Sequence, residues 1–356
     1  MLDDKLKALW ARISPPQKAA FFGCFLSGYL VHLYVFTNII PNSDGLSRIF
    51  DPQQMTVSGR WFLHFASYFN GFTQMPAVIG LFSVLFLALA AALAVSLLGI
   101  RSRALSALSG ALMAAFPAVG YTFLYLFTAS AYCFAIFLAV LSVSLARRGR
   151  WHWLAGCLLL ACSMGTYQAY VTVAIGLSLL VIFRETLDPS ASFSATLRLG
   201  VRLMLFLAAG AVLYYGILLV FLQVKDLELL SYLGMDAASS GYPFSRLPGL
   251  LLDTYKQVAP FFFLPGSANT FTSGWMAVLD LAALALGGGC FLLCMGQEGL
   301  WRARWRPLGG LAMLALLPLG MNFMQVLSPY SAPTPLMKYA FAAVYLLVLM
   351  VLDVAD

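Results

Sequence analysis

Residues 75–99 read MPAVIGLFSVLFLALAAALAVSLLG, an apolar run without a charged side chain. A helix needs about 20 apolar residues to cross the roughly 30 Å hydrocarbon core of a bilayer. Arg101 and Arg103 follow directly, and basic residues beside a span usually mark its cytoplasmic end. The stretch therefore predicts a transmembrane helix that ends in the cytoplasm.

Similar runs fill the 356-residue chain, of which 62% is hydrophobic and only 10% charged. A soluble domain averages about a quarter charged residues, so the composition indicates that lipid is the solvent. We therefore expect an all-α integral membrane protein of about ten transmembrane helices. They are predicted at 19–40, 75–99, 104–119, 122–146, 151–165, 168–183, 200–223, 275–296, 308–326 and 338–353.

The N-terminal residues 1–18 carry charge before the first apolar run and show no small-residue cleavage site. We expect them to form a retained, cytoplasmic amphipathic stub. Residues 19–356 are then a single transmembrane domain. No internal repeat of fixed period is evident, so the paired repeats of many transporters are not indicated.

The net charge of +7 comes from basic clusters between the apolar runs, which indicates membrane topology and no nucleic-acid partner. With the N-terminus inside, 15 of the 21 Lys and Arg residues fall on the cytoplasmic side. The remaining six lie outside: Arg48, Arg60, Lys225, Arg246, Lys256 and Lys338. We therefore expect a bacterial inner-membrane protein with both termini in the cytoplasm.

Two connections on the outer side are long, at about 41–75 and 223–275. Both mix aromatic residues with glycine and polar residues, and the second is also rich in proline and serine, which is typical of short helices lying at the membrane interface. Long loops on one face often carry function. We expect the functional site at this outer face.

The first outer loop contains two carboxylates and two guanidinium groups, Asp44, Arg48, Asp51 and Arg60. If the segment is helical, Asp44, Arg48 and Asp51 share one face. A carboxylate there can act as a general base, and an arginine can hold a phosphate through two hydrogen bonds. The alternative is a solvated loop with internal ion pairs.

Other polar residues are candidates by position. Tyr167 and Gln168 stand at an outer turn, where they can bind a sugar or bridge two helices. Lys338 begins the last run and can bind an anion or anchor at the interface. Arg246 and Lys256 of the second loop are weaker candidates for the same reason. The cysteines lie inside apolar runs and no histidine has a second ligand nearby, so we expect no metal site and no cofactor.

Three motifs in order resemble one known family. SDGLSR (43–48), SGRW (58–61) and GTYQAYVTVAIGLSLL (165–180) resemble the polytopic O-antigen glucosyltransferases of the serotype-converting type, in the GT-C superfamily. The resemblance covers about residues 20–185. It implies a GT-C-like fold and a sugar donor carried on a polyprenyl phosphate.

The resemblance also implies roles for individual residues. Asp44 corresponds to the catalytic base of the first outer loop. Arg48 and Arg60 correspond to the arginines that follow it, and Lys338 stands where an arginine is expected, so these three would bind the donor phosphate. Tyr167 and Gln168 match a Tyr-Gln pair that would contact the sugar or acceptor, a role that we also assign to Asp51, Arg246 and Lys256.

We therefore expect an inverting, metal-independent glycosyltransferase that moves a sugar, with glucose as the expected one, from polyprenyl phosphate to a surface glycan such as lipopolysaccharide on the periplasmic face. A lipid-linked glycan polymerase or ligase is an alternative enzyme. A membrane transporter or flippase is the alternative from another class, but it should place ionisable residues in the middle of several spans.

Overall fold

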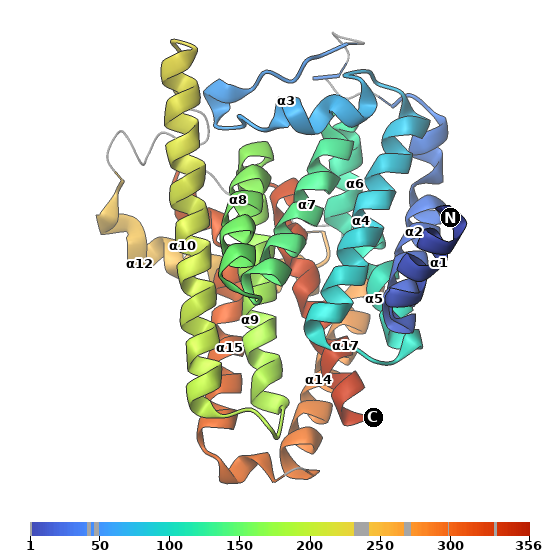
Figure 1. Ribbon diagram of the computed structural model, residues 1–356. Helices are drawn as coiled ribbons and strands as arrows, with labels where there is room; N and C mark the ends of the chain where they lie inside the picture. Colours follow the sequence, from blue (N-terminus) through green and yellow to red (C-terminus); the bar gives the residue numbers. More distant parts are fainter. Residues whose placement is uncertain are drawn as a thin grey trace.

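The computed structural model describes residues 2–40, 44–45, 50–230, 242–266, 272–297, 299–330 and 333–356. This part of the chain consists of helices joined by turns and loops, with two isolated β-bridges and no longer strand. Figure 1 shows the helices as an upright bundle with a short-helix segment, including α3, across its top. The helices of the bundle and of the second long loop are α1 (Leu2–Arg12), α2 (Pro15–Thr37), α4 (Pro76–Leu98), α5 (Arg103–Ala115), α6 (Pro117–Leu124), α7 (Leu126–Ala146), α8 (Arg150–Thr166), α9 (Val171–Leu187), α10 (Phe193–Val224), α12 (Leu247–Lys256), α13 (Val258–Phe263), α14 (Gly274–Gln297), α15 (Trp305–Met321), α16 (Met324–Leu327) and α17 (Ala343–Ala355).

Within the described ranges, eight helical segments are long and apolar enough to cross a membrane. They correspond to eight of the ten predicted runs, and they make the chain an integral membrane protein. The runs predicted at 151–165 and 308–326 form α8 and α15, which have only 17 residues each. Ten spans therefore remain a prediction.

Two predicted boundaries differ from the structure for local reasons. The run predicted at 104–119 continues to Leu124 as two helices, α5 and α6, which are divided at Phe116. Pro117 ends α5 and begins α6, because proline is well tolerated at the first position of a new helix. The run predicted at 200–223 begins at Phe193, where the Ser192 hydroxyl accepts a hydrogen bond from the Ala195 amide (3.3 Å). The resulting α10 has 32 residues.

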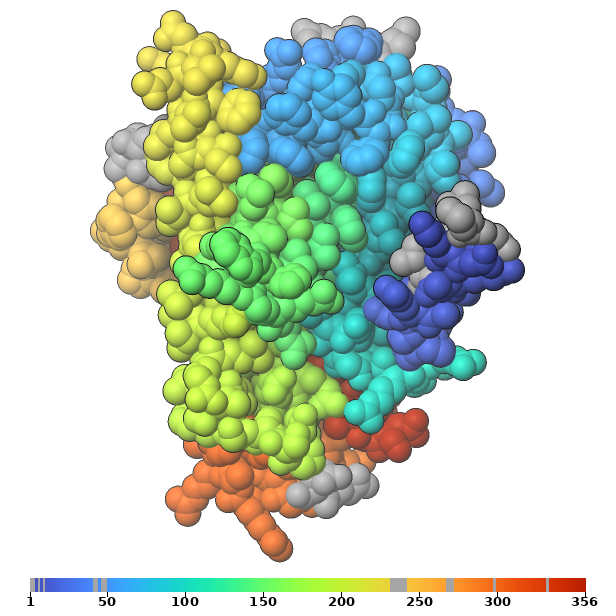
Figure 2. All heavy atoms as spheres, in the orientation of Figure 1, coloured from blue at the N-terminus to red at the C-terminus, as the bar shows by residue number. Residues whose placement is uncertain are grey.

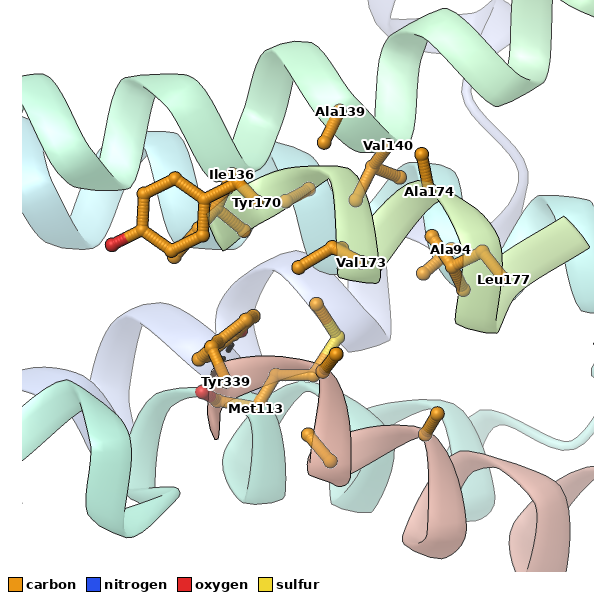
Figure 3. Close-up of a cluster of buried hydrophobic side chains, with 14 of the residues drawn as sticks. Ala94, Met113, Ile136, Ala139, Val140, Tyr170, Val173, Ala174, Leu177 and Tyr339 are labelled. Atoms are coloured by element: carbon orange, nitrogen blue, oxygen red, sulfur yellow. Dashed lines mark hydrogen bonds between the residues drawn. The ribbon is translucent and has the colours of Figure 1, made fainter. Parts of the chain in front are cut away.

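The helices α4, α7, α9 and α17 form the centre of the bundle, whereas α2, α10 and α14 are the least buried spans. Figure 3 shows the packing where α4, α5, α7 and α9 meet Tyr339. Small residues allow close approach at the edge of the bundle. A Cβ atom at Gly110 would overlap the Ala20 carbonyl of α2, which is the kind of backbone contact that drives helix association in lipid.

Amide side chains attach the second long loop to the end of the bundle. Gln257, between α12 and α13, donates to the Gln325 side chain (2.7 Å) and accepts from Asn322 (3.3 Å). The Asn322 amide also donates to the carbonyl of Thr254 (3.3 Å). These bonds hold α12 against α15 and α16, while α13 packs on α14.

At the opposite end of the bundle, three arginines bind the free carbonyls at helix C-termini. Arg147 donates to Leu97 at the end of α4 (3.1 Å), and Arg202 donates to Ala146 at the end of α7 (2.6 Å). Arg306, which is 6% exposed, donates to four carbonyls at and after the end of α9, those of Thr186, Asp188, Pro189 and Ala191. Basic groups are favourable there because the last carbonyls of a helix lack partners and carry partial negative charge. We call this the arginine-rich end; the turns after α9 and α14 lie at the bottom of Figure 1.

The replacement Arg306→Met should therefore destabilise the fold. It keeps an apolar stem but removes the donor to one buried and three partly buried carbonyls. Because an unsatisfied buried group costs about 1–3 kcal/mol, the thermal unfolding midpoint in detergent should fall by about 5 °C or more. Arg304→Met is the matched control, because Arg304 is exposed and its side chain has no hydrogen bond or ion pair within the described residues. Equal midpoints for both variants would contradict the capping role.

Candidate functional site

The first outer loop forms a compact segment, residues 50–75, which we call the first-loop segment. It contains η1 (Thr56–Ser58), α3 (Leu63–Ala66) and η2 (Ser67–Asn70). Two β-bridges, Phe50 with Thr73 and Met55 with Arg60, close it at two places. Gly59 has φ 77° between η1 and Arg60, a conformation that favours glycine. The sharp turn there aims Arg60 back toward the bundle.

Trp61 and Phe62 attach the segment to the end of α8. The Phe62 amide donates to the carbonyl of Gly165 (2.7 Å). The Trp61 ring lies directly on Gly165, where a Cβ atom would come within 2.6 Å of it, and stacks on Phe221 of α10 with centroids 5.6 Å apart. Trp61 is 6% exposed. The aromatic stretch after Arg60 was expected at the membrane interface, and its first residue instead packs inside the protein.

Gln168 joins the segment to α10. Its side-chain amide donates to the carbonyl of Ser58 (2.9 Å) and to the Tyr214 hydroxyl (3.0 Å), and that hydroxyl donates to the carbonyl of Gly59 (3.0 Å). Gln168 and Tyr214 are both buried. Because an unsatisfied buried carbonyl is costly, these bonds fix the backbone immediately before Arg60.

Arg60 lies against two tyrosines. Its guanidinium carbon is 4.9 Å from the centroid of the Tyr167 ring, and its Nη1 donates to the Tyr132 hydroxyl (3.2 Å). The two rings stack with centroids 4.7 Å apart, and each tyrosine is 3% exposed. The aromatic faces attract the cation and exclude water from one side of it. Arg60 itself stays partly exposed, so it is oriented and accessible to an anion.

Lys338 is a second cation close to this region. It lies on η6 (Pro335–Ala342), which packs against α6 and against η3 (Gln168–Tyr170). In Figure 3 Tyr170 and Tyr339, from these two elements, belong to one buried cluster. Lys338 is 5% exposed, with its ammonium 5.9 Å from the Phe261 ring. Within the described residues it has no hydrogen bond and no ion pair, and a buried cation of this kind in a membrane protein usually has a functional role.

The acids of the first outer loop lie apart from these contacts. Asp44 is exposed in a turn with Gly45, whose carbonyl accepts from the Gln74 side chain (2.8 Å). Asp51 accepts from the Gln53 amide (2.9 Å) and so closes a local turn. Residues 50–54 are not helical. Asp51 therefore does not share a helical face with Asp44. Arg48 lies outside the described residues.

The cations of the second loop are on its surface. Arg246 is exposed with its guanidinium 5.8 Å from the Tyr330 ring, and Lys256 pairs with Asp253 (3.7 Å). The helices of this loop, α12 and α13, pack on α14, α15 and α16 rather than on the first-loop segment. The two loops meet elsewhere, where the Leu230 amide donates to the carbonyl of Val57 (2.9 Å).

Tyr132 and Tyr214 were missed by the sequence reasoning. Each lies within a long, mostly apolar helix, Tyr132 in α7 and Tyr214 in α10, and a tyrosine in such a run is usually interpreted as a core residue. The available signal was that a buried tyrosine hydroxyl needs a hydrogen-bond partner. The partners are 72 and 46 residues away in sequence, Arg60 and Gln168, so the pattern alone does not identify them.

Comparisons with known proteins agree with the sequence resemblance. The model of one protein family, glucosyl transferase GtrII, matches residues 33–352. The match includes the first-loop segment, Tyr167, Gln168 and Lys338. No curated protein and no solved structure matched the chain. The family match covers most of the chain and confirms the predicted resemblance: this membrane protein belongs to the glucosyl transferase GtrII family.

Proposed function

We propose that the protein transfers glucose from a polyprenyl phosphate to a surface glycan on the periplasmic face of the bacterial inner membrane. The family supports a membrane glycosyltransferase. The donor, the sugar, the acceptor and the GT-C inverting type are part of the proposal. The partition of basic residues supports a periplasmic site with both termini in the cytoplasm.

The observation that carries the proposal is the cation Arg60, fixed on Tyr132 and Tyr167 at the end of the bundle that bears the long loops. A lipid phosphate is an anion that stays at the membrane surface, and its acyl or polyprenyl tail requires apolar helices beside it. A guanidinium can donate two parallel hydrogen bonds to a phosphate. The buried ammonium of Lys338, on the element next to η3, is a second charge of the right sign.

These cations would act on the leaving group. As the acceptor oxygen bonds to the anomeric carbon, the bond from that carbon to the phosphate oxygen breaks, and negative charge develops on the departing lipid phosphate. Fixed donors aimed at such a developing charge lower the barrier because they need no reorganisation during the reaction. Arg60 is pre-oriented by its tyrosines, and Arg48 and Lys338 would complete the phosphate site.

A general base must accept the proton of the attacking hydroxyl. We assign this role to Asp44, an exposed carboxylate in the loop that precedes the first-loop segment. Displacement by an oxygen on the opposite side of the sugar inverts the anomeric configuration. No step needs a metal ion, because Arg48, Arg60 and Lys338 would balance the charge of the phosphate.

Tyr167, Gln168 and Asp51 are assigned to the sugar or acceptor side of the site, with Arg246 and Lys256 as outer contacts for the glycan. The contacts of Gln168 and Asp51 support an indirect version of this role. Gln168 holds the backbone of Ser58 and Gly59, and Asp51 holds the turn at Gln53. Both would position the loop around a substrate.

Asp44→Asn should abolish transfer while leaving the protein folded and inserted. Asparagine has nearly the same shape but cannot accept the proton, and loss of a general base costs about 10² to 10⁴ in rate. Transfer is measured in membranes as incorporation of labelled glucose from polyprenyl-phosphate glucose into the glycan.

Asp51→Asn is the matched control, since it also removes one carboxylate from the same loop. It should keep much of the activity, because an asparagine oxygen can still accept from the Gln53 amide. Full transfer by Asp44→Asn at normal expression would remove Asp44 from the mechanism.

Arg60→Gln should reduce turnover about 10² to 10³-fold, the typical loss for one donor to a developing anion. Tyr132→Phe keeps the stacked ring but removes the hydroxyl that accepts from Arg60, so a smaller loss of about tenfold or less is expected. Single-turnover rates with saturating donor separate this effect from weaker binding.

The control for Arg60→Gln is Lys225→Gln, which removes a cation from the same end of the bundle. Lys225 is exposed, and its ammonium is 3.5 Å from the Thr56 hydroxyl. It should change turnover less than threefold. Comparable losses for the two variants would mean that any positive charge at this end suffices, which contradicts a specific role for Arg60.

A further inference from the structure

A groove lies at the arginine-rich end, far along the helices from the candidate site. It runs between the start of α8 and the first third of α10 and has a volume of about 530 Å³. Figure 2 looks onto this side, where the green start of α8 meets the yellow-green part of α10. Three of its lining residues are arginines, Arg150, Arg198 and Arg202, and none is acidic.

The floor of the groove is apolar. Leu197, Val201 and Leu205 are spaced by four residues, so they share one face of α10. They are 54%, 44% and 53% exposed, so this aliphatic stripe can lie against the hydrocarbon chain of a lipid. Trp153 of α8 forms the other wall, and its indole donates to the carbonyl of Arg202 (3.4 Å).

The three arginines differ in what they bind. Arg202 is occupied by the carbonyls at the end of α7. Arg150 and Arg198 are exposed, and their side chains make no hydrogen bond or ion pair in the part of the chain that the structure describes. Two cations without counterions therefore stand above an apolar stripe, and an anion with a hydrocarbon chain matches both features.

We propose that this groove binds one anionic phospholipid. Its phosphate lies between Arg150 and Arg198, and one acyl chain lies along Leu197, Val201 and Leu205. Basic pockets between transmembrane helices commonly bind lipid headgroups in this way, and an interfacial tryptophan fits the level of the headgroups. The site is independent of glycosyl transfer and does not rest on the proposed function.

Binding of dioctanoyl phosphatidylglycerol to the full-length protein in neutral detergent tests the proposal, with native mass spectrometry to count adducts. One saturable site is expected, with dioctanoyl phosphatidylcholine binding at least about fivefold more weakly. Arg150→Gln with Arg198→Gln should weaken phosphatidylglycerol binding about tenfold, because each cation near the surface contributes to attraction. Arg150→Lys with Arg198→Lys should retain most of it.

The control is Arg103→Gln with Arg302→Gln, which removes two exposed charges from the same end but none from the groove. It should change the affinity less than twofold. Equal weakening by both double variants would mean that only net charge matters and would overturn the site. Binding of inorganic phosphate as tight as that of the lipid would also overturn it, because the apolar stripe would then contribute nothing.

Discussion

Gln168 connects the first-loop segment to the bundle, and the position of Arg60 depends on it. Its amide donates to the carbonyl of Ser58 and to Tyr214, which in turn donates to the carbonyl of Gly59. These groups are buried, so water cannot replace a lost hydrogen-bond partner. Breaking one of the bonds therefore leaves a buried polar group unsatisfied, which lowers the stability of the fold. These bonds fix the loop backbone immediately before Arg60 against α10 and η3.

The two ends of the bundle use arginine in different ways. At the arginine-rich end, Arg147, Arg202 and Arg306 donate to helix C-termini, so part of the basic cluster that marks topology also completes the backbone hydrogen bonds of the fold. At the loop-bearing end, Arg60 contacts aromatic rings and a hydroxyl, which orient its guanidinium. The first arrangement stabilises the fold, and the second fixes the direction of a partly exposed cation.

The sequence predicted most of the helices because apolar length is a direct physical requirement of a bilayer. The run expected at 75–99 is α4, Pro76–Leu98, and the run expected at 275–296 is α14. Errors arose where local chemistry decides, at Pro117 and at the Ser192 cap. In the site, Tyr167 and Gln168 were predicted from the motif that contains them. Their partners Tyr132 and Tyr214 were not, since contacts across 46 residues or more leave no periodic signal, and the expected role of Asp44 stays a prediction.

We propose that the donor phosphate binds at the loop-bearing end between Arg60 and Lys338. A cryo-electron microscopy structure of the protein in lipid nanodiscs, with polyprenyl-phosphate glucose bound, would locate that phosphate. We expect phosphate oxygens within about 3 Å of the Arg60 guanidinium and of the Lys338 ammonium, with Tyr132 and Tyr167 still against Arg60. A donor phosphate bound away from both cations, with Arg60 facing only its tyrosines, would contradict it.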